Sequence, residues 1–270
     1  MSTPANDPGI AFELDDELVT AQPGETIWSA ARRHGVLIPH LCHSDGLRPD
    51  GNCRACVVEI AGERTLAPSC CRAPTPGMKV QAASPRARKS QQMVVEMLLS
   101  DMPDMGYRWN DEQKNTPELI AGSAYPESAR GQFDSKTPES TGQHGELSEW
   151  ATRLGVAVRP ALKALRRQQP APDLSHPAMA VNLDACIQCN RCVRACREEQ
   201  VNDVIGYALR GAESKIVFDL DDPMAESTCV ACGECVQACP TGALSPKTHI
   251  GSQKVDRKVD SVCPFCGVGC

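Results

Sequence analysis

Cysteine is the residue whose spacing in this chain could do chemistry. The chain has 16 cysteines among 270 residues, and the spacing C-x2-C-x2-C-x3-C occurs twice, at 186–196 and 229–239. The two stretches, CIQCNRCVRAC and CVACGECVQAC, are identical at six of eleven positions and lie 43 residues apart. Two such copies predict two equivalent sites. Closely spaced, reduced thiolates are metal ligands, so the chemistry they predict is metal binding.

The spacing of each copy is that of bacterial ferredoxins, in which three close thiolates bind one [4Fe-4S] cluster and the fourth cysteine serves the other cluster. The first cluster is therefore expected to be bound by Cys186, Cys189, Cys192 and Cys239. The second is expected to be bound by Cys229, Cys232, Cys235 and Cys196. The first copy departs from the motif at one position, because Arg197 stands where the second copy has Pro240. Two structural zinc sites are the alternative, but zinc does not require interleaved repeats.

A third set of cysteines near the N-terminus has the looser spacing C-x10-C-x2-C-x13-C, and its members are Cys42, Cys53, Cys56 and Cys70. The helix before it and the strand after it favour a [2Fe-2S] site, although its first loop is longer than in plant-type ferredoxins. Gly46 and Gly51 in that loop can let backbone N–H groups approach the bridging sulfides. Cys71 is the alternative fourth ligand, and Cys70 is preferred because neighbouring strand residues point to opposite faces.

Two histidines, His40 and His43, flank Cys42 and raise the alternative of a Rieske centre, in which histidines replace two cysteines on one iron. That arrangement would leave two of the four cysteines without a role, so both histidines are expected to have ordinary surface roles. The sequence contains no Gly-rich phosphate loop, nucleophile elbow or zinc-protease helix. No catalytic residue is therefore assigned to this chain.

Composition excludes several classes of function. The formal net charge of −6 and the isoelectric point near 5.6 argue against a general nucleic-acid binder, which needs a basic surface. The opening residues, MSTPANDPGIAFELDD, have neither the basic nor the apolar region of a secretory leader, so a cytoplasmic protein is expected. No stretch approaches the ~20 apolar residues that span a membrane, so direct membrane insertion is not expected.

The pattern along the chain predicts a small mixed sheet crossed by one helix, and then further helices. Residues 10–20 alternate as a hairpin, residues 23–35 read as a helix started by Pro23, and VVEI, RTLAPS and MKVQA read as strands. A helix is expected after Ser84, with Met93, Val94, Met97 and Leu98 on its apolar face. A flexible insertion is expected at about 111–145. ELSEWATRLG and PALKALRRQQP read as helices, the second ending in solvated arginines.

The order of these motifs resembles one known family. PGETIWSAARRHGVLIPHLC, GNCRACVVEI and LAPSC, then the two repeats and CPFCGVGC, are similar to the N-terminal part of the alpha subunit of cytoplasmic NAD-dependent molybdenum formate dehydrogenases. The resemblance implies that Cys263, Cys266 and Cys270 begin a molybdopterin domain with a further [4Fe-4S] cluster, whose fourth ligand and molybdopterin cofactor lie beyond this chain. A truncated product, a split subunit and a partial reading frame would each account for that ending.

The expected fold class is α+β with four parts. Residues 1–83 would form a β-grasp [2Fe-2S] ferredoxin-like domain, and residues 84–172 a helical middle segment with the flexible insertion. Residues 173–250 would form a double [4Fe-4S] bacterial-ferredoxin-like domain, and residues 251–270 the incomplete start of a molybdopterin oxidoreductase domain.

The function that the resemblance implies is electron relay from formate oxidation at molybdenum towards a flavin- and NAD-binding partner subunit, in a complex with a small iron-sulfur subunit. Similar subunits of complex I and of iron-only hydrogenases carry a cluster held by one histidine and three cysteines after the [2Fe-2S] module. No cysteine lies between Cys71 and Cys186, so that cluster is expected to be absent, and direct transfer between the remaining centres is left open. The alternatives are a diaphorase-type subunit of an NAD-reducing hydrogenase and a zinc-stabilised structural protein.

Overall fold

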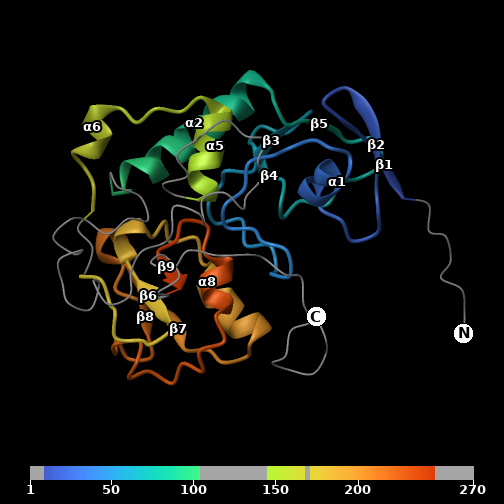
Figure 1. Cartoon of the computed structure of the whole chain (residues 1–270). Helices are drawn as coiled ribbons and strands as arrows, with labels where there is room; N and C mark the ends of the chain where they lie inside the picture. Colours follow the sequence, from blue (N-terminus) through green and yellow to red (C-terminus); the bar gives the residue numbers. More distant parts are fainter. Residues whose placement is uncertain (1–8, 104–144, 168–170, 247–270) are drawn as a thin grey trace, which may run out of the picture.

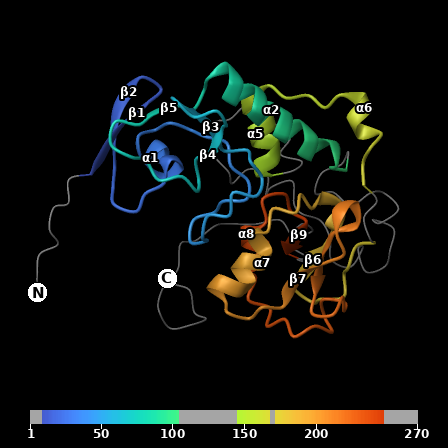
Figure 2. The same cartoon turned by 180° about the vertical axis from the view of Figure 1, so that it is seen from behind.

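The computed structural model describes residues 9–103, 145–167 and 171–246 (Figure 1). The N-terminal strands and α1 lie on one side of the molecule, and the short strands and helices of the cysteine repeats lie on another. Helices α2 and α5 run beside each other in both views (Figure 2). Nearly all of the insertion expected at 111–145, and the C-terminal cysteines expected to begin a molybdopterin domain, lie outside the described residues.

Five short strands form a mixed sheet in the order β2-β1-β5-β3-β4. The strands are β1 (Ile10–Leu14), β2 (Glu17–Ala21), β3 (Val57–Ile60), β4 (Ala67–Pro68) and β5 (Lys79–Gln81). β1 is parallel to β5, and the other neighbouring pairs are antiparallel. Asp15 and Asp16 both have positive φ, 49° and 68°, as a tight turn that matches the strand twist requires. The predicted hairpin and mixed sheet are therefore confirmed.

Helix α1 (Ile27–Arg33) covers one face of this sheet and buries its apolar side against the hairpin. It begins after Thr26, not at Pro23, because the Thr26 hydroxyl accepts a hydrogen bond from the Ser29 N–H at 3.2 Å. Phe12 of β1 is fully buried in the same core, and such burial stabilises a fold by about 1.5–3 kcal/mol per side chain. The loop that carries Cys42 follows α1 and is therefore attached to this packed core.

Helix α2 (Pro85–Ser100) starts as predicted, with Ser84 capping the Ala87 N–H at 3.1 Å. Its buried face is rotated from the predicted one. Met93 and Met97 are 48% and 61% exposed, so their predicted place on the packed face was wrong.

The face of α2 that is buried includes a polar residue, Gln91. Its side-chain amide donates to the Val57 carbonyl at 2.9 Å and to the Ala82 carbonyl at 3.1 Å. Val95 is also fully buried, and Val94 and Leu98 of the predicted face do contact the core. The Val57 and Ala82 carbonyls thus accept hydrogen bonds from a side-chain amide that a hydropathy pattern would assign to solvent.

Two further helices follow, α5 (Glu146–Leu154) and the short α6 (Pro160–Lys163). α5 packs on α2 and begins at the Pro240 carbonyl, which accepts from the Glu146 N–H at 3.0 Å. The arginines after α6 are not merely solvated. Arg167 pairs with Asp101 at 2.8 Å and donates to the Cys186 carbonyl at 3.2 Å. None of the helices in the described ranges is both long enough and apolar enough to cross a membrane.

The repeat region consists of two small antiparallel sheets and short helices. One sheet pairs β6 (Met179–Val181) with β9 (Leu244–Pro246), and the other pairs β7 (Ile205–Ala208) with β8 (Lys215–Phe218). Helix α7 (Arg191–Arg194), continued by the π-helical turn η3 (Ala195–Glu199), packs against α8 (Glu234–Ala238). Single 3-10 turns occur at η2 (Leu183–Ala185) and η4 (Gly211–Glu213). The described residues therefore have the mixed helix and strand content that the sequence predicts.

Replacing Gln91 by Met should lower the stability of the folded chain, because the side-chain volume is retained while two buried carbonyls lose their donor. The expected loss is about 1–3 kcal/mol. Thermal unfolding followed by circular dichroism measures it. The control is Lys89→Met on an exposed face of the same helix, and an equal change in both variants would contradict the assigned role of the Gln91 amide.

Candidate metal centres

The N-terminal cysteines meet at one end of the mixed sheet. The Cys42 N–H donates to the Cys53 sulfur at 3.4 Å, and the Ala55 N–H donates to the same sulfur at 3.5 Å. The Cys56 and Cys70 sulfurs lie 3.3 Å apart. The four thiols predicted as [2Fe-2S] ligands are thus gathered in one place, and Cys71 is exposed.

The ionisation of these four thiols is strongly interdependent. Hydrogen bonds from the Cys53 and Cys70 thiols lower the pKa of Cys42 to about 2. The Cys70 thiol likewise lowers the pKa of Cys56 to about 7. The thiols that donate these bonds resist losing their protons, so the pKa values of Cys53 and Cys70 are raised. Four neighbouring thiolates repel one another, and a positively charged iron group would relieve that repulsion.

The loop between Cys42 and Cys53 depends on two glycines. Gly46 and Gly51 have φ values of +84° and +64°, in the region that side chains rarely adopt. A Cβ at Gly51 would lie 3.0 Å from the Cys71 sulfur, and one at Gly46 would lie 3.3 Å from the Glu199 carboxylate. The Glu199 carboxylate, at the end of the turn that follows the first repeat, therefore lies beside this loop.

The expectation of surface roles for His40 and His43 was wrong. His43 is 7% exposed, and both rings pack edge-on against Trp28 at a centroid distance of 4.5 Å. Burial lowers the pKa of both histidines, which favours their neutral forms. The two rings therefore belong to an aromatic cluster beneath the Cys42 loop, which Trp150 of α5 completes.

The two cysteine repeats have the same backbone conformation. Gln188 and Asn190 of the first copy have positive φ, as do Ala231 and Gly233 at the equivalent positions of the second. In each copy the N–H two residues after the first cysteine donates to its sulfur at 3.4 Å, and a short helix follows. Such N–H groups stabilise a thiolate. The internal repeat of the sequence is therefore also a repeat of structure.

The first set of thiols surrounds a largely enclosed cavity in the repeat region. Four cysteines line it together with apolar and hydroxyl side chains, and these cysteines are Cys186, Cys189, Cys192 and Cys239. Burial, together with the nearby Cys239, raises the pKa of the Cys186 thiol to about 11. Three of these cysteines come from the first copy and one from the second, which is the arrangement that the spacing predicts for ligand exchange.

The second set of thiols combines buried and exposed members. Burial and the charges of the other three members together raise the pKa of Cys235 to about 12; these members are Cys229, Cys232 and Cys196. Cys232 is exposed and Val230 in the same loop is 62% exposed. The second set therefore has one exposed member, Cys232, while its Cys196 and Cys235 are buried.

The donor groups present fit iron-sulfur clusters. Each of the three sets offers four sulfurs, and N–H groups of the surrounding loops point at a sulfur in every set. No group of three or more histidine, cysteine, aspartate or glutamate side chains among the described residues is arranged as the ligands of one metal ion. The first set instead lines a cavity.

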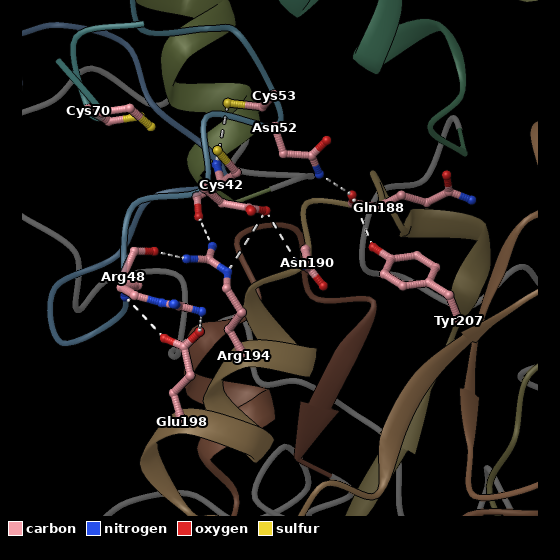
Figure 3. Close-up of polar contacts among 12 residues, drawn as sticks. Cys42, Arg48, Asn52, Cys53, Cys70, Gln188, Asn190, Arg194, Glu198 and Tyr207 are labelled. Carbon is pink, nitrogen blue, oxygen red and sulfur yellow. Dashed lines mark hydrogen bonds and ion pairs between the residues drawn. The ribbon is translucent and has the colours of Figure 1, made fainter.

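The binuclear loop, defined as residues 42–56, contacts the first repeat directly. Figure 3 shows Asn52, beside Cys53, donating through its amide to the Gln188 carbonyl at 3.0 Å, and the Tyr207 hydroxyl donating to the same carbonyl at 3.2 Å. Arg194 donates to the carbonyls of Cys42 and Arg48. The [2Fe-2S] set and the first [4Fe-4S] set therefore lie on adjoining loops, a contact that the sequence left open.

Additional polar contacts close this interface. The Asn190 amide donates to the Asp50 carboxylate at 3.2 Å, and Arg48 pairs with Glu198 at 3.2 Å. Arg191 donates to the His43 carbonyl. None of these polar side chains was singled out from the sequence. The only signal there was the pair of arginines next to Cys192 in the first copy, which the second copy lacks.

Two protein-family models match parts of the chain. The model described as a 2Fe-2S iron-sulfur cluster binding domain matches residues 7–85. The model described as a 4Fe-4S dicluster domain matches residues 185–243. The first range contains the N-terminal set of cysteines, and the second contains both repeats. The chain therefore has a 2Fe-2S and a 4Fe-4S ferredoxin-type domain.

Relatives are found among large oxidoreductase subunits. An NADH-quinone oxidoreductase subunit of Rhizobium meliloti is 27% identical over 97% of this chain and 27% of its own length. "Putative formate dehydrogenase YrhE" of Bacillus subtilis is 24% identical over 97% of this chain and 28% of its own length. The chain thus spans little more than a quarter of either relative.

A solved structure matches over most of both chains. It is a chain of the NAD+-reducing [NiFe]-hydrogenase in the H2-reduced state, with a TM-score of 0.65 and 25% identity, covering 88% of this chain and 87% of that one. The chain is accordingly related to iron-sulfur subunits of NADH-quinone oxidoreductase, hydrogenase and formate dehydrogenase type.

Proposed function

We propose that this chain is the electron-relay portion of an NAD-dependent formate dehydrogenase alpha subunit. It would pass electrons from formate oxidation at a molybdenum site towards a flavin- and NAD-binding partner subunit, with a small iron-sulfur subunit in the same complex. The observation that carries the relay role is the contact of the binuclear loop with the first repeat through Asn52 and Gln188. A third set of thiols, with Cys232 exposed, would continue the path from these two adjoining sets.

The chain's own residues would hold and insulate the redox groups. Iron-sulfur clusters would supply one-electron carriers when bound to the three sets of thiols. Their ligands would be Cys42, Cys53, Cys56 and Cys70 for [2Fe-2S], and the two exchanged sets of four for the [4Fe-4S] clusters. The apolar side chains around the first set would limit its access to water, whereas the exposed loop around Cys232 would leave the second set open to another redox group.

The assignment to formate, rather than another donor, rests on sequence. CPFCGVGC at 263–270 resembles the opening of a molybdopterin domain, where Cys263, Cys266 and Cys270 would hold a further [4Fe-4S] cluster. A formate dehydrogenase is among the relatives, at 24% identity. A second candidate is the electron-transfer subunit of an NAD-reducing hydrogenase, and the likeness to the solved hydrogenase chain over most of both chains favours it.

The native complex decides between these two functions. The chain would be tagged in its own host and purified anaerobically with its partners, and NAD+ reduction would be measured with formate and with H2. Formate-dependent reduction with molybdenum in the complex is the expected result. H2-dependent reduction with nickel would favour the second candidate, and reduction with neither donor would contradict both.

Cys70 should be required for the [2Fe-2S] cluster and Cys71 should not. Cys70→Ala is expected to lose about two irons per chain and the binuclear EPR signal, because the buried Cys70 thiol faces Cys56. Cys71→Ala, one residue away and exposed, is the matched control and should keep both. Loss of the signal only in the Cys71 variant would reverse the assignment.

The two [4Fe-4S] sites should exchange their fourth ligands. Cys196→Ala should therefore reproduce the EPR spectrum of Cys232→Ala, since both belong to the second set. Cys239→Ala should reproduce the spectrum of Cys189→Ala, since both line the cavity of the first set. Each variant is expected to lose about four irons. The opposite pairing of spectra would show that each repeat holds its own cluster.

A further inference from the structure

Two buried cations, Arg191 and Arg194, lie where the binuclear loop meets the first repeat. They are 2% and 5% exposed and flank Cys192 on α7. Figure 3 shows the Arg194 guanidinium between the Cys42 and Arg48 carbonyls. Arg191 donates to the His43 carbonyl and, at 3.4 Å, to the Ala238 carbonyl. Both side chains are therefore withdrawn from water and placed between two predicted cluster sites.

The positive charge of this pair is only partly balanced by carboxylates. Arg191 pairs with Glu146 at 2.6 Å, but the Glu146 side chain is 39% exposed and is therefore screened by water. Among the described residues, Asp50 is the one carboxylate that pairs with Arg194, 4.0 Å away and 33% exposed, and the Arg194 charge also lowers the pKa of Glu198. Within the described part of the chain, the Nε of each arginine is buried and has no hydrogen-bond partner. A buried charge is costly unless something of opposite sign lies near it.

The second repeat shows that a cysteine repeat can form without these cations. Its equivalent positions, 43 residues on, are Glu234 and Gln237. The loop before them has the same positive-φ residues, and α8 begins at the position equivalent to the start of α7. The ligand loop therefore does not need the arginines in order to form. Their contacts are instead with the binuclear loop that packs against the first repeat.

We infer that Arg191 and Arg194 raise the reduction potentials of the first [4Fe-4S] cluster and the [2Fe-2S] cluster, respectively. The inference rests on the cluster assignments of the proposed function. Each cluster gains one electron on reduction, and a buried positive charge beside it favours the added negative charge in a poorly screened interior. Arg194 donates to the carbonyl of Cys42, one of the residues that would hold the [2Fe-2S] cluster. Arg191 lies near the Cys189 and Cys239 thiols of the first set.

The test is a redox titration of the anaerobically reconstituted full chain with dithionite, followed by EPR. In Arg194→Gln, the residue that the second repeat carries, the [2Fe-2S] midpoint should fall by at least about 59 mV, a tenfold change in a one-electron equilibrium. In Arg191→Gln the same fall is expected for the [4Fe-4S] signal that Cys189→Ala removes. The control is Arg48→Gln. It removes a charge from the same interface, but the Arg48 side chain is 82% exposed, so water screens that charge.

Arg194→Lys keeps the positive charge but loses the guanidinium that donates to two carbonyls, so it separates the effect of charge from that of hydrogen bonding. This variant also tests the inference if Arg194→Gln does not retain its cluster. It should keep the [2Fe-2S] midpoint within the shift seen for Arg48→Gln. A fall in the Lys variant as large as that expected for Gln would overturn the inference, as would Gln variants that shift no further than the control. A wild-type chain that takes up no clusters would instead contradict the proposed function.

Discussion

The arrangement of the described residues depends on a buried guanidinium that needs acceptors. Arg194 on α7 finds them in the Cys42 and Arg48 carbonyls, 152 and 146 residues earlier in the chain. An unsatisfied buried donor of this kind is costly, so the binuclear loop has one favourable position against the repeat region. The register of Asn52 on Gln188 follows from that position, as does the packing of α5 over the junction.

Local backbone geometry determines how the thiols converge. Residues with positive φ turn each ligand loop so that an N–H group faces a sulfur and a short helix can begin directly afterwards. Tight loops can present three sulfurs from one direction, and the fourth must come from elsewhere. The antiparallel pairing of β6 with β9 brings the end of the second repeat back beside the start of the first.

The sequence predicted the elements and the groups of cysteines better than it predicted the packing. The strands, the Ser84 cap and the gathering of Cys239 with the first set are local or periodic properties that residue spacing carries. The solvent-facing Met97 was assigned to the packed side of α2 and the buried Gln91 was not singled out, because hydropathy does not register the backbone carbonyls that an amide can satisfy. The docking arginines could not be predicted, since their acceptors are backbone groups of a distant loop.

The difference between Arg197 and Pro240 breaks the symmetry of the duplicated unit. After Cys239 the chain turns out of the helix, since the residue before a proline avoids the helical region. After Cys196 it continues as η3, which carries Glu198 to Arg48 and Glu199 to Gly46. Two identical repeats could pack against the binuclear loop in either of two orientations. Here only the first repeat is followed by η3, so only one orientation makes these contacts. The two-repeat module therefore has two different ends, and only the end with η3 contacts the binuclear loop. This asymmetry gives the order of the three sets of thiols a direction.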